Sequence, residues 1–418
     1  MDFAGPRRAV SVGTPTAEGA HPDRLSLVKT ITNLWATGDP SVESIQPLQY
    51  PLEPSEHIFH KFSVMVRENE PSSIIAFSLS SEEYRKKLRQ MQDHPRSERD
   101  HGFLEEVAHV DDVEAETGPG IKEALLNPSE NHIKYQFDAE SSIKLYCKVF
   151  FAGQFEALRR NCGYDGMTYI ESLSRCVRWS ASGGKSGSAF LKTRDDRLLI
   201  KQMSRAELDA FLTFAPAYFA YMSRSFFHEL PTMLAKVFGF YRIGFKNPVT
   251  GKSIRLDVLI MENLFYNRKF TKIFDLKGSM RNRHVSTEEK HAVLLDENLV
   301  ELIYESPLLI REHSKILLRQ SVWNDTLFLS KFNIMDYSLL VGVDEEKEDL
   351  VVGIVDFIRT FTWDKKLESW VKETGFLGGG GKEPTIITPK QYKKRFREAM
   401  ENYFLMVPDK YCRAGMMR

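Results

Sequence analysis

The chain has 418 residues, of which 42% are hydrophobic and 27% charged, and its formal net charge is zero. This balance is typical of a folded globular protein, and the length allows two or three domains. A net charge of zero excludes long-range attraction of the whole molecule to an anionic partner. We therefore expect no nucleic-acid partner, and any attraction to anions must come from local basic clusters.

The four cysteines are scattered, and no two have the spacing of metal ligands, which predicts a reduced, intracellular protein. No apolar signal segment stands at the N-terminus. The longest uncharged aromatic-rich run, residues 211–223, is too short to span a bilayer. Any contact with a membrane would therefore have to be made from its surface.

The first 131 residues divide into three parts. Residues 1–56 are rich in Pro, Ser, Gly and Thr and are predicted to be disordered. Residues 57–91 are predicted to form a small strand-strand-helix unit that packs on or near the rest of the protein. Within this unit, residues 57–66 tend to alternate, residues 73–79 form a short apolar run, and residues 82–90 have a charged, helical pattern. Residues 92–131 are acidic and are predicted to be a solvated linker.

An ordered domain is predicted over residues 132–412, with a first lobe to about 262 and a second from about 263. Apolar and β-branched runs predict strands at 143–151, 189–193, 198–202, 235–243, 255–261, 272–276, 337–343 and 350–358. Helical patterns are found at 154–160, 297–304, 312–331 and 390–403. This order of elements indicates an α+β fold of two lobes with a cleft between them.

A further helix is predicted to begin at Ser204, because Ser204 and Glu207 have the S-x-x-E spacing of a capping box. Proline has no backbone N–H and its ring clashes with the preceding turn. We therefore expect Pro216 to interrupt or kink this helix.

The loop SASGGKSGSAF, residues 180–190, precedes a predicted strand and is the first candidate for chemistry. Glycines allow backbone N–H groups to approach phosphate oxygens where a Cβ would clash. A Walker A loop would need a glycine at Trp179 and a helix after the loop, so that motif is excluded. The remaining alternative is a glycine-rich hairpin turn.

Lys201 lies in LLIKQM, on the strand that follows the loop strand. A lysine among apolar strand residues is not expected to be buried without a partner. In protein kinases, a strand lysine after a glycine-rich loop holds the ATP phosphates. Glu207 is the candidate partner, and the alternative is that Glu207 only closes the capping box.

Asp336, in IMDYSLLVG, and Asp356, in IVDFIR, lie at the ends of two predicted adjacent strands. A lone carboxylate in an apolar strand is costly to bury, and a bound cation removes that cost. Mg²⁺ needs only one or two carboxylates beside substrate phosphates. Either both aspartates hold the metal, or Asp356 holds it alone while Asp336 orients the attacking hydroxyl or accepts its proton. The non-catalytic alternative is that both aspartates only cap strands and turns.

A polar, basic segment follows the strand at 272–276, and it begins with Asp275 and Lys277. Arg281, Arg283 and His284 come next. The segment could contact ATP phosphates or a lipid headgroup, and the alternative is a solvated loop.

Six motifs in order resemble the phosphoinositide-phosphate kinase family over residues 141–410. They are GGKSGSAF, LLIKQM, VLIMENLF, IFDLKGS, IMDYSLLVG and IVDFIR. Within the family, the sequence is most similar to the phosphatidylinositol 3-phosphate 5-kinases whose full-length members carry a FYVE zinc finger. The segments that carry this likeness are MENLFYNRKFTKIFDLKGSMRNRHV, IRTFTWDKKLESW, GFLGGGGKEPT and YFLMVPD.

The resemblance implies a two-lobed lipid kinase with an antiparallel sheet in the N-lobe and a mixed C-lobe, using ATP and Mg²⁺. It also implies the C-terminal catalytic part of a longer protein, in peripheral contact with the cytosolic face of endosomal membranes and with scaffold partners. Asp336 matches the catalytic-loop aspartate and Asp356 the metal-binding aspartate, while Asp275 and Lys277 match an active-site motif. The residues that match nucleotide-binding positions are Gly183, Gly184, Ser186, Gly187, Ser188, Lys201, Glu262, Asn263 and Leu264.

The segment at about 359–390 matches the loop that selects the lipid. Four glycines, at 378–381, precede Lys382 there, where phosphatidylinositol 4-phosphate 5-kinases carry a lysine pair. Glycines impose little conformation, so we expect a mobile loop that orders on the membrane. The residues expected to meet anionic headgroups are Arg281, Arg283, Lys382, Lys390, Lys393, Lys394 and Arg395. For the last three, a solvated basic helix face is the alternative.

Two other classes of protein compete with this interpretation. A protein kinase predicts His-Arg-Asp, Asp-Phe-Gly and Ala-Pro-Glu motifs. Here Phe357 and Ile358 follow the metal aspartate, and the other two motifs are absent from the sequence. A catalytically silent phosphoinositide-binding scaffold has no need of Lys201, Asp336 and Asp356 together.

Overall fold

The computed structural model describes residues 52–60, 62–93, 120–127, 131–139, 143–177, 190–281, 283–285, 293–344, 346–347, 349–358 and 388–411. Most of the predicted disordered region and most of the predicted acidic linker lie outside these residues. So do the glycine-rich loop and nearly all of the predicted lipid-selecting segment.

The N-lobe is built on a seven-stranded sheet in which every neighbouring pair is antiparallel. Its strands in spatial order are β3 (Ile133–Asp138), β4 (Lys144–Phe150), β8 (Val237–Lys246), β9 (Ser253–Glu262), β7 (Leu198–Met203), β6 (Phe190–Thr193) and β5 (Cys176–Val177). The strands predicted in the first half of the domain are confirmed.

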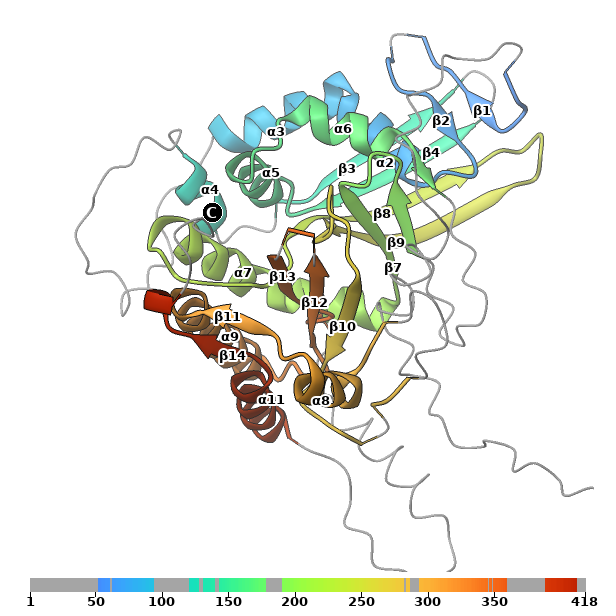
Figure 1. The fold of residues 1–418 in the computed structure, drawn as a ribbon. Helices are drawn as coiled ribbons and strands as arrows, with labels where there is room; N and C mark the ends of the chain where they lie inside the picture. Colours follow the sequence, from blue (N-terminus) through green and yellow to red (C-terminus); the bar gives the residue numbers. More distant parts are fainter. Residues whose placement is uncertain are drawn as a thin grey trace, which may run out of the picture.

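The C-lobe contains a three-stranded antiparallel sheet of β10 (Lys272–Leu276), β12 (Ser338–Asp344) and β13 (Asp349–Val355). The predicted helices are α8 (Asp296–Glu305), α9 (Glu312–Lys331) and α11 (Pro389–Tyr403), which Figure 1 shows on the outer side of this sheet. A parallel pair, β11 (Leu309–Arg311) with β14 (Leu405–Val407), was not predicted. Strands of three residues are too short for periodicity to reveal.

Helix α7 (Arg205–Phe227) connects the two lobes through aromatic contacts. Phe211 stacks on Phe240 of β8 at a centroid distance of 4.9 Å, and Phe214 lies 5.3 Å from Phe328 of α9. The expected interruption at Pro216 is wrong, since the helix continues to Phe227. The lost hydrogen bond and ring clash cost about 3 kcal/mol, and burial of aromatic residues on both sides of the proline offsets that cost.

The N-terminal unit, defined as residues 52–93, packs on the N-lobe. It comprises β1 (Glu56–His57), β2 (Val66–Arg67), α2 (Ser72–Ser80) and α3 (Glu82–Asp93). The run at 73–79, expected as a strand, is helical and buried on all sides. A short apolar run does not distinguish a buried strand from a buried helix, which explains the error. The predicted acidic linker also contains a short helix, α4 (Ile121–Leu126), beside α5 (Ala152–Asn161).

The segment before β8 joins the C-lobe sheet directly. The Ala235 N–H donates to the Ile354 carbonyl at 2.9 Å, and the Ile354 N–H donates to the Met233 carbonyl at 2.7 Å. Asp325 of α9 fixes the same segment, because it accepts hydrogen bonds from the Met233 N–H, the Thr232 hydroxyl and Tyr221 of α7. One fully buried carboxyl therefore connects both lobes and the chain between them.

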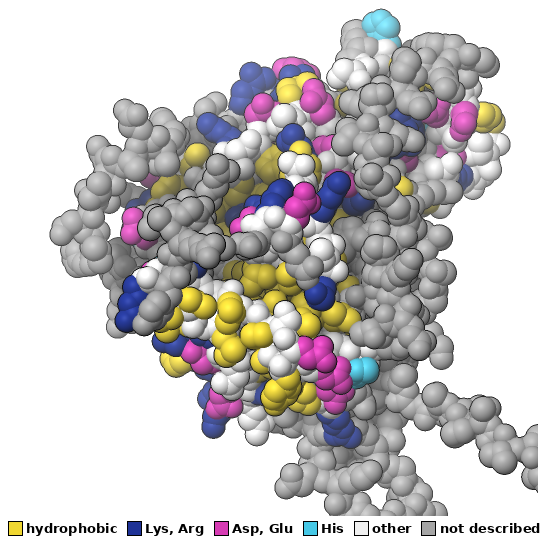
Figure 2. Space-filling model, in the orientation of Figure 1, with side chains coloured by type: hydrophobic (Ala, Val, Ile, Leu, Met, Phe, Trp, Pro, Cys, Tyr) yellow, Lys and Arg dark blue, Asp and Glu magenta, His cyan; other side chains and the backbone are white. Residues whose placement is uncertain are grey.

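The outer face of the C-lobe exposes hydrophobic side chains, which Figure 2 shows over the region of α8, β11 and β14. The exposed large hydrophobic residues of these elements are Tyr304, Leu309, Leu405 and Met406. None of the helices in the described part of the chain combines the length and apolar character that a membrane crossing requires.

The buried Asp325 predicts a pH-dependent stability. Burial raises the pKa of its carboxyl to about 6, although the donated hydrogen bonds oppose the shift. Because the folded-state pKa lies above the ordinary value, the stabilising contribution is complete at acidic pH and is lost as the pH rises through about 6. Chemical denaturation of the chain and of Asp325→Asn, which does not titrate, measures this effect. Relative to Asp325→Asn, the free energy of unfolding of the unsubstituted chain should fall between about pH 4 and about pH 6 and then level off. A pH-independent difference would contradict the prediction.

Candidate active site

Lys201 of β7 lies between carboxylates from both lobes. Its side chain is buried, and its Nζ atom is 3.2 Å from Oδ1 of Asp356 and 3.8 Å from Oε1 of Glu207. Asp356 follows β13 in the C-lobe, 155 positions away in the sequence. The predicted partner Glu207 is thus near Lys201, and a second partner comes from the C-lobe.

Glu207 fulfils both roles that the sequence left open. Its Oε2 atom accepts from the backbone N–H of Ser204 at 2.9 Å, and Ser204 in turn caps α7. The other carboxylate oxygen faces Lys201. The capping box therefore fixes the carboxylate that approaches the lysine.

Asp336 and Asp356 lie at the same end of the β12–β13 hairpin, as predicted. Ser338 pairs with Val355, so Asp336 stands two residues before that pair and Asp356 one residue after it. Both have left-handed backbone conformations, with φ of 65° and 61°. This conformation is uncommon for residues other than glycine, and it recurs at functional sites.

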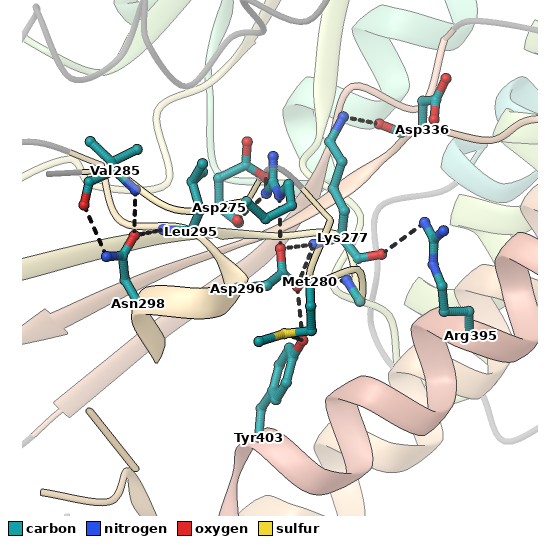
Figure 3. Close-up of polar contacts among 12 residues, drawn as sticks. Asp275, Lys277, Met280, Val285, Leu295, Asp296, Asn298, Asp336, Arg395 and Tyr403 are labelled. Carbon is teal, nitrogen blue, oxygen red and sulfur yellow. Dashed lines mark hydrogen bonds and ion pairs between the residues drawn. The ribbon is translucent and has the colours of Figure 1, made fainter. Parts of the chain in front are cut away.

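Lys277 connects the polar segment after β10 to this end of the hairpin. Its Nζ atom donates to the backbone carbonyl of Asp336 at 2.8 Å, as Figure 3 shows. The side chain of Asp336 remains exposed to solvent. Lys277 therefore fixes the backbone of Asp336 without neutralising its carboxylate directly.

Asp296 at the start of α8 organises the segment that carries Lys277 (Figure 3). This fully buried carboxylate accepts from the backbone N–H groups of Lys277 and Gly278, at 3.1 and 2.7 Å, and from the hydroxyl of Tyr403 at 3.0 Å. Asp296 was not among the residues predicted from the sequence. An aspartate at a helix start is common, and nothing local distinguishes this one.

The position of Arg283 does not support the predicted contact of this residue with lipid. Its guanidinium lies 3.2 Å from the carboxylate of Asp275 and 2.9 Å from that of Asp296, and the side chain is 14% exposed. Burial alone would lower the pKa of Arg283, but the two carboxylates raise it above its ordinary value. The role of Arg283 in the structure is to hold this segment together, and Asp275 is likewise engaged inside it.

The segment Glu262–Leu264, between the lobes, is partly engaged in the fold. The backbone N–H of Glu262 donates to Lys236, and that of Asn263 donates to Arg197. Among the described residues, no backbone hydrogen bond engages the N–H of Leu264.

The remaining predicted residues stand on α11, follow β10 or lie outside the described residues. Lys390, Lys393 and Lys394 stand near the start of α11, and Arg281 is exposed after β10. Those outside the described residues are Gly183, Gly184, Ser186, Gly187, Ser188 and Lys382.

A family model and several known proteins are similar to this chain. The family model described as phosphatidylinositol-4-phosphate 5-kinase matches residues 172–350 and 344–403, more than half of the chain. The chain belongs to this family. The membership confirms the resemblance inferred from the motifs and agrees with the two-lobed α+β fold.

Among similar proteins, the chain is 49% identical to the 1-phosphatidylinositol 3-phosphate 5-kinase FAB1 of Saccharomyces cerevisiae, over 94% of the chain and 20% of that protein. It is 50% identical to the human 1-phosphatidylinositol 3-phosphate 5-kinase, over 72% of the chain and 14% of the relative. It is 43% identical to the 1-phosphatidylinositol-3-phosphate 5-kinase FAB1A of Arabidopsis thaliana, over 84% of the chain and 21% of that relative. The chain thus spans about a fifth or less of these curated relatives.

The close packing of Gly278 against α11 predicts that position 278 tolerates no side chain. Its φ is 67°, and an added Cβ would lie 2.9 Å from Cβ of Ala399 and 3.1 Å from the Arg395 carbonyl. Gly278→Ala should destabilise the chain by about 2–4 kcal/mol, because backbone strain and a backbone clash add. Thermal and chemical unfolding measure the loss.

Gly251→Ala is the matched control for that substitution. Gly251 has a similar φ of 71°, but nothing lies within 4 Å of an added Cβ. It should lose only the strain contribution, about 1 kcal/mol. Equal losses in the two variants would show that the contact with α11 is unimportant.

Proposed function

We propose that this chain is an ATP-dependent lipid kinase that phosphorylates the 5-hydroxyl of phosphatidylinositol 3-phosphate to give phosphatidylinositol 3,5-bisphosphate. The observation that carries the proposal is the buried contact of Lys201 in the N-lobe with Asp356 in the C-lobe. The names of the relatives in yeast, human and Arabidopsis support the choice of lipid.

The nucleotide would lie between the lobes. Family membership implies the use of ATP, and Lys201 is a buried cation at the cleft, suited to hold its phosphates. The backbone of the segment Glu262–Leu264 would meet the adenine ring. The glycine and serine residues at 183–188 remain the predicted phosphate loop.

Asp356 fits a divalent cation such as Mg²⁺. Among the described residues there is no group of three or more His, Cys, Asp and Glu side chains around one metal position. One or two carboxylates suffice for Mg²⁺, because phosphate oxygens and water complete its coordination. The ion, when bound, neutralises charge on the transferring phosphate, while Lys201 holds the carboxylate of Asp356 in place.

Asp336 is suited to act on the acceptor hydroxyl. Its carboxylate is exposed at the hairpin end while its backbone is held by Lys277, so it can align the hydroxyl and accept its proton. Because phosphoryl transfer depends mainly on positioning and charge stabilisation, a fixed backbone beneath this carboxylate contributes directly to rate.

The lipid would be met at a membrane surface by exposed cations. Arg281 and the α11 lysines Lys390, Lys393 and Lys394 support this, together with Lys382 from outside the described residues. Each such cation contributes about 1 kcal/mol near an anionic surface. We place the chain peripherally on the cytosolic face of endosomal membranes, with scaffold partners bound by the longer protein.

A radiolabelled ATP assay on liposomes tests the proposal. Label should appear chiefly in the bisphosphate made from phosphatidylinositol 3-phosphate, rather than from the 4-phosphate or the unmodified lipid. Asp356→Asn should lower kcat by about 100-fold or more, since it removes the metal-binding charge. Asp349→Asn, at the other end of β13 in an exposed pair with Arg268, should change kcat less than about twofold.

Other outcomes separate the alternatives. Equal label from the 4-phosphate would retain a lipid kinase and overturn the assigned substrate. Binding to vesicles without transfer to any lipid would favour a catalytically silent scaffold. Equal losses in Asp356→Asn and Asp349→Asn, with unchanged melting temperatures, would overturn the assignment of Asp356.

A further inference from the structure

The N-terminal unit lies outside the residues matched by the family model, which begin at position 172. It is nevertheless part of the N-lobe core. Ile74, Ile75 and Phe77 of α2 are completely buried, and the Phe77 ring lies 5.2 Å from that of Phe137 in β3. The N-terminal unit is therefore an integral part of the lobe that carries Lys201.

Two buried glutamates of this unit bind different parts of the lobe. Glu68 faces the turn between β8 and β9, where it lies 2.9 Å from the amide nitrogen of Asn247 and 3.5 Å from Nζ of Lys252. Glu70 instead faces β5, the edge strand at the other side of the sheet. The exposed fractions of the two residues are similar, at 6% and 8%.

Glu70 holds β5 through its backbone and a neighbouring side chain. Its Oε2 atom accepts from the backbone N–H of Cys176 at 2.9 Å and from Nε of Arg175 at 3.2 Å. Arg194, in the turn between β6 and β7, lies 3.9 Å from Oε1. Strand β5 has only two residues and one neighbouring strand, so this carboxylate supplies its contact on the other side.

Two pairs of neighbouring strands, β5 with β6 and β6 with β7, connect the Glu70 contact to Lys201. Cys176 pairs with Thr193 of β6, and Phe190, at the start of β6, pairs with Lys201 of β7. The Phe190 ring centroid is 5.7 Å from the Lys201 ammonium group. Residues 178–189, which contain the glycine-rich motif, connect β5 to β6 in the sequence. Glu70 contacts β5, one of the two strands that flank this connection.

We infer that Glu70 is a positioning residue for ATP, acting through β5 and β6 on the nucleotide side of the cleft. The N-terminal unit thereby contributes to nucleotide affinity although it lies away from Lys201 and Asp356 in the sequence. This inference rests on the proposed ATP-dependent reaction. It concerns ATP and not the lipid, because β5 and β6 belong to the N-lobe while the candidate lipid cations lie in the C-lobe.

Glu70→Gln in the full chain tests the inference, with Glu68→Gln as the matched control. Both changes remove one buried charge from the same unit. Glu70→Gln should raise KM for ATP by roughly 3- to 10-fold and leave KM for phosphatidylinositol 3-phosphate liposomes within about twofold. Glu68→Gln should leave both constants within about twofold, whatever its effect on melting temperature.

A direct binding measurement separates this inference from the proposed function. Titration with a fluorescent ATP analogue needs no lipid, and Glu70→Gln should weaken its Kd by the same factor. Absence of lipid turnover in the unsubstituted chain would remove the proposed function, while the Kd comparison would still test Glu70. Equal Kd values for both variants and the unsubstituted chain, or parallel changes in both KM values, would overturn the inference. If Glu70→Gln does not fold, Arg175→Gln removes one side-chain partner of the same carboxylate and should weaken the Kd in the same direction.

Discussion

The buried ammonium group of Lys201 is the constraint on which the arrangement of the two lobes depends. A lysine that is 6% exposed needs carboxylates nearby, and here they come from α7 and from the end of β13. Because Asp356 belongs to the C-lobe, the nearer of the two carboxylates is in place only when the lobes face each other. The same geometry brings a cation and a carboxylate together where a nucleotide and a metal ion would meet.

Backbone and aromatic contacts fix the distance between the lobes. Strand β13 pairs with β12 on one side, and on the other Ile354 bonds to the segment before β8. Asp356 follows two residues after Ile354, so its position is set from both lobes. Helix α7 adds a second connection, with one face on the N-lobe sheet and another on α9. These contacts therefore hold Asp356 at the position that the Lys201 ammonium group requires.

Much of the fold and of the candidate site could be predicted because the signals are local. The hairpin of β12 and β13, the capping box of α7 and the strand lysine all follow from alternation, capping spacing and side-chain chemistry within a few residues. Helix α2 could not be recognised, because a fully buried helix shows no polar face. Arg283 was assigned to lipid for a related reason: a basic loop residue looks the same in sequence whether it faces solvent or two buried carboxylates.

The sequence by itself determined which elements form and which residues carry charge suited to phosphate chemistry, together with the family to which the motifs point. The tertiary structure alone decided which charges meet: Lys201 with Asp356 over 155 positions, Arg283 with Asp296, and Glu70 with the edge strand β5. The physical reason is that the energy of a charged group depends on its burial and on its neighbours in space. Neither quantity is defined until distant segments of the chain have packed together.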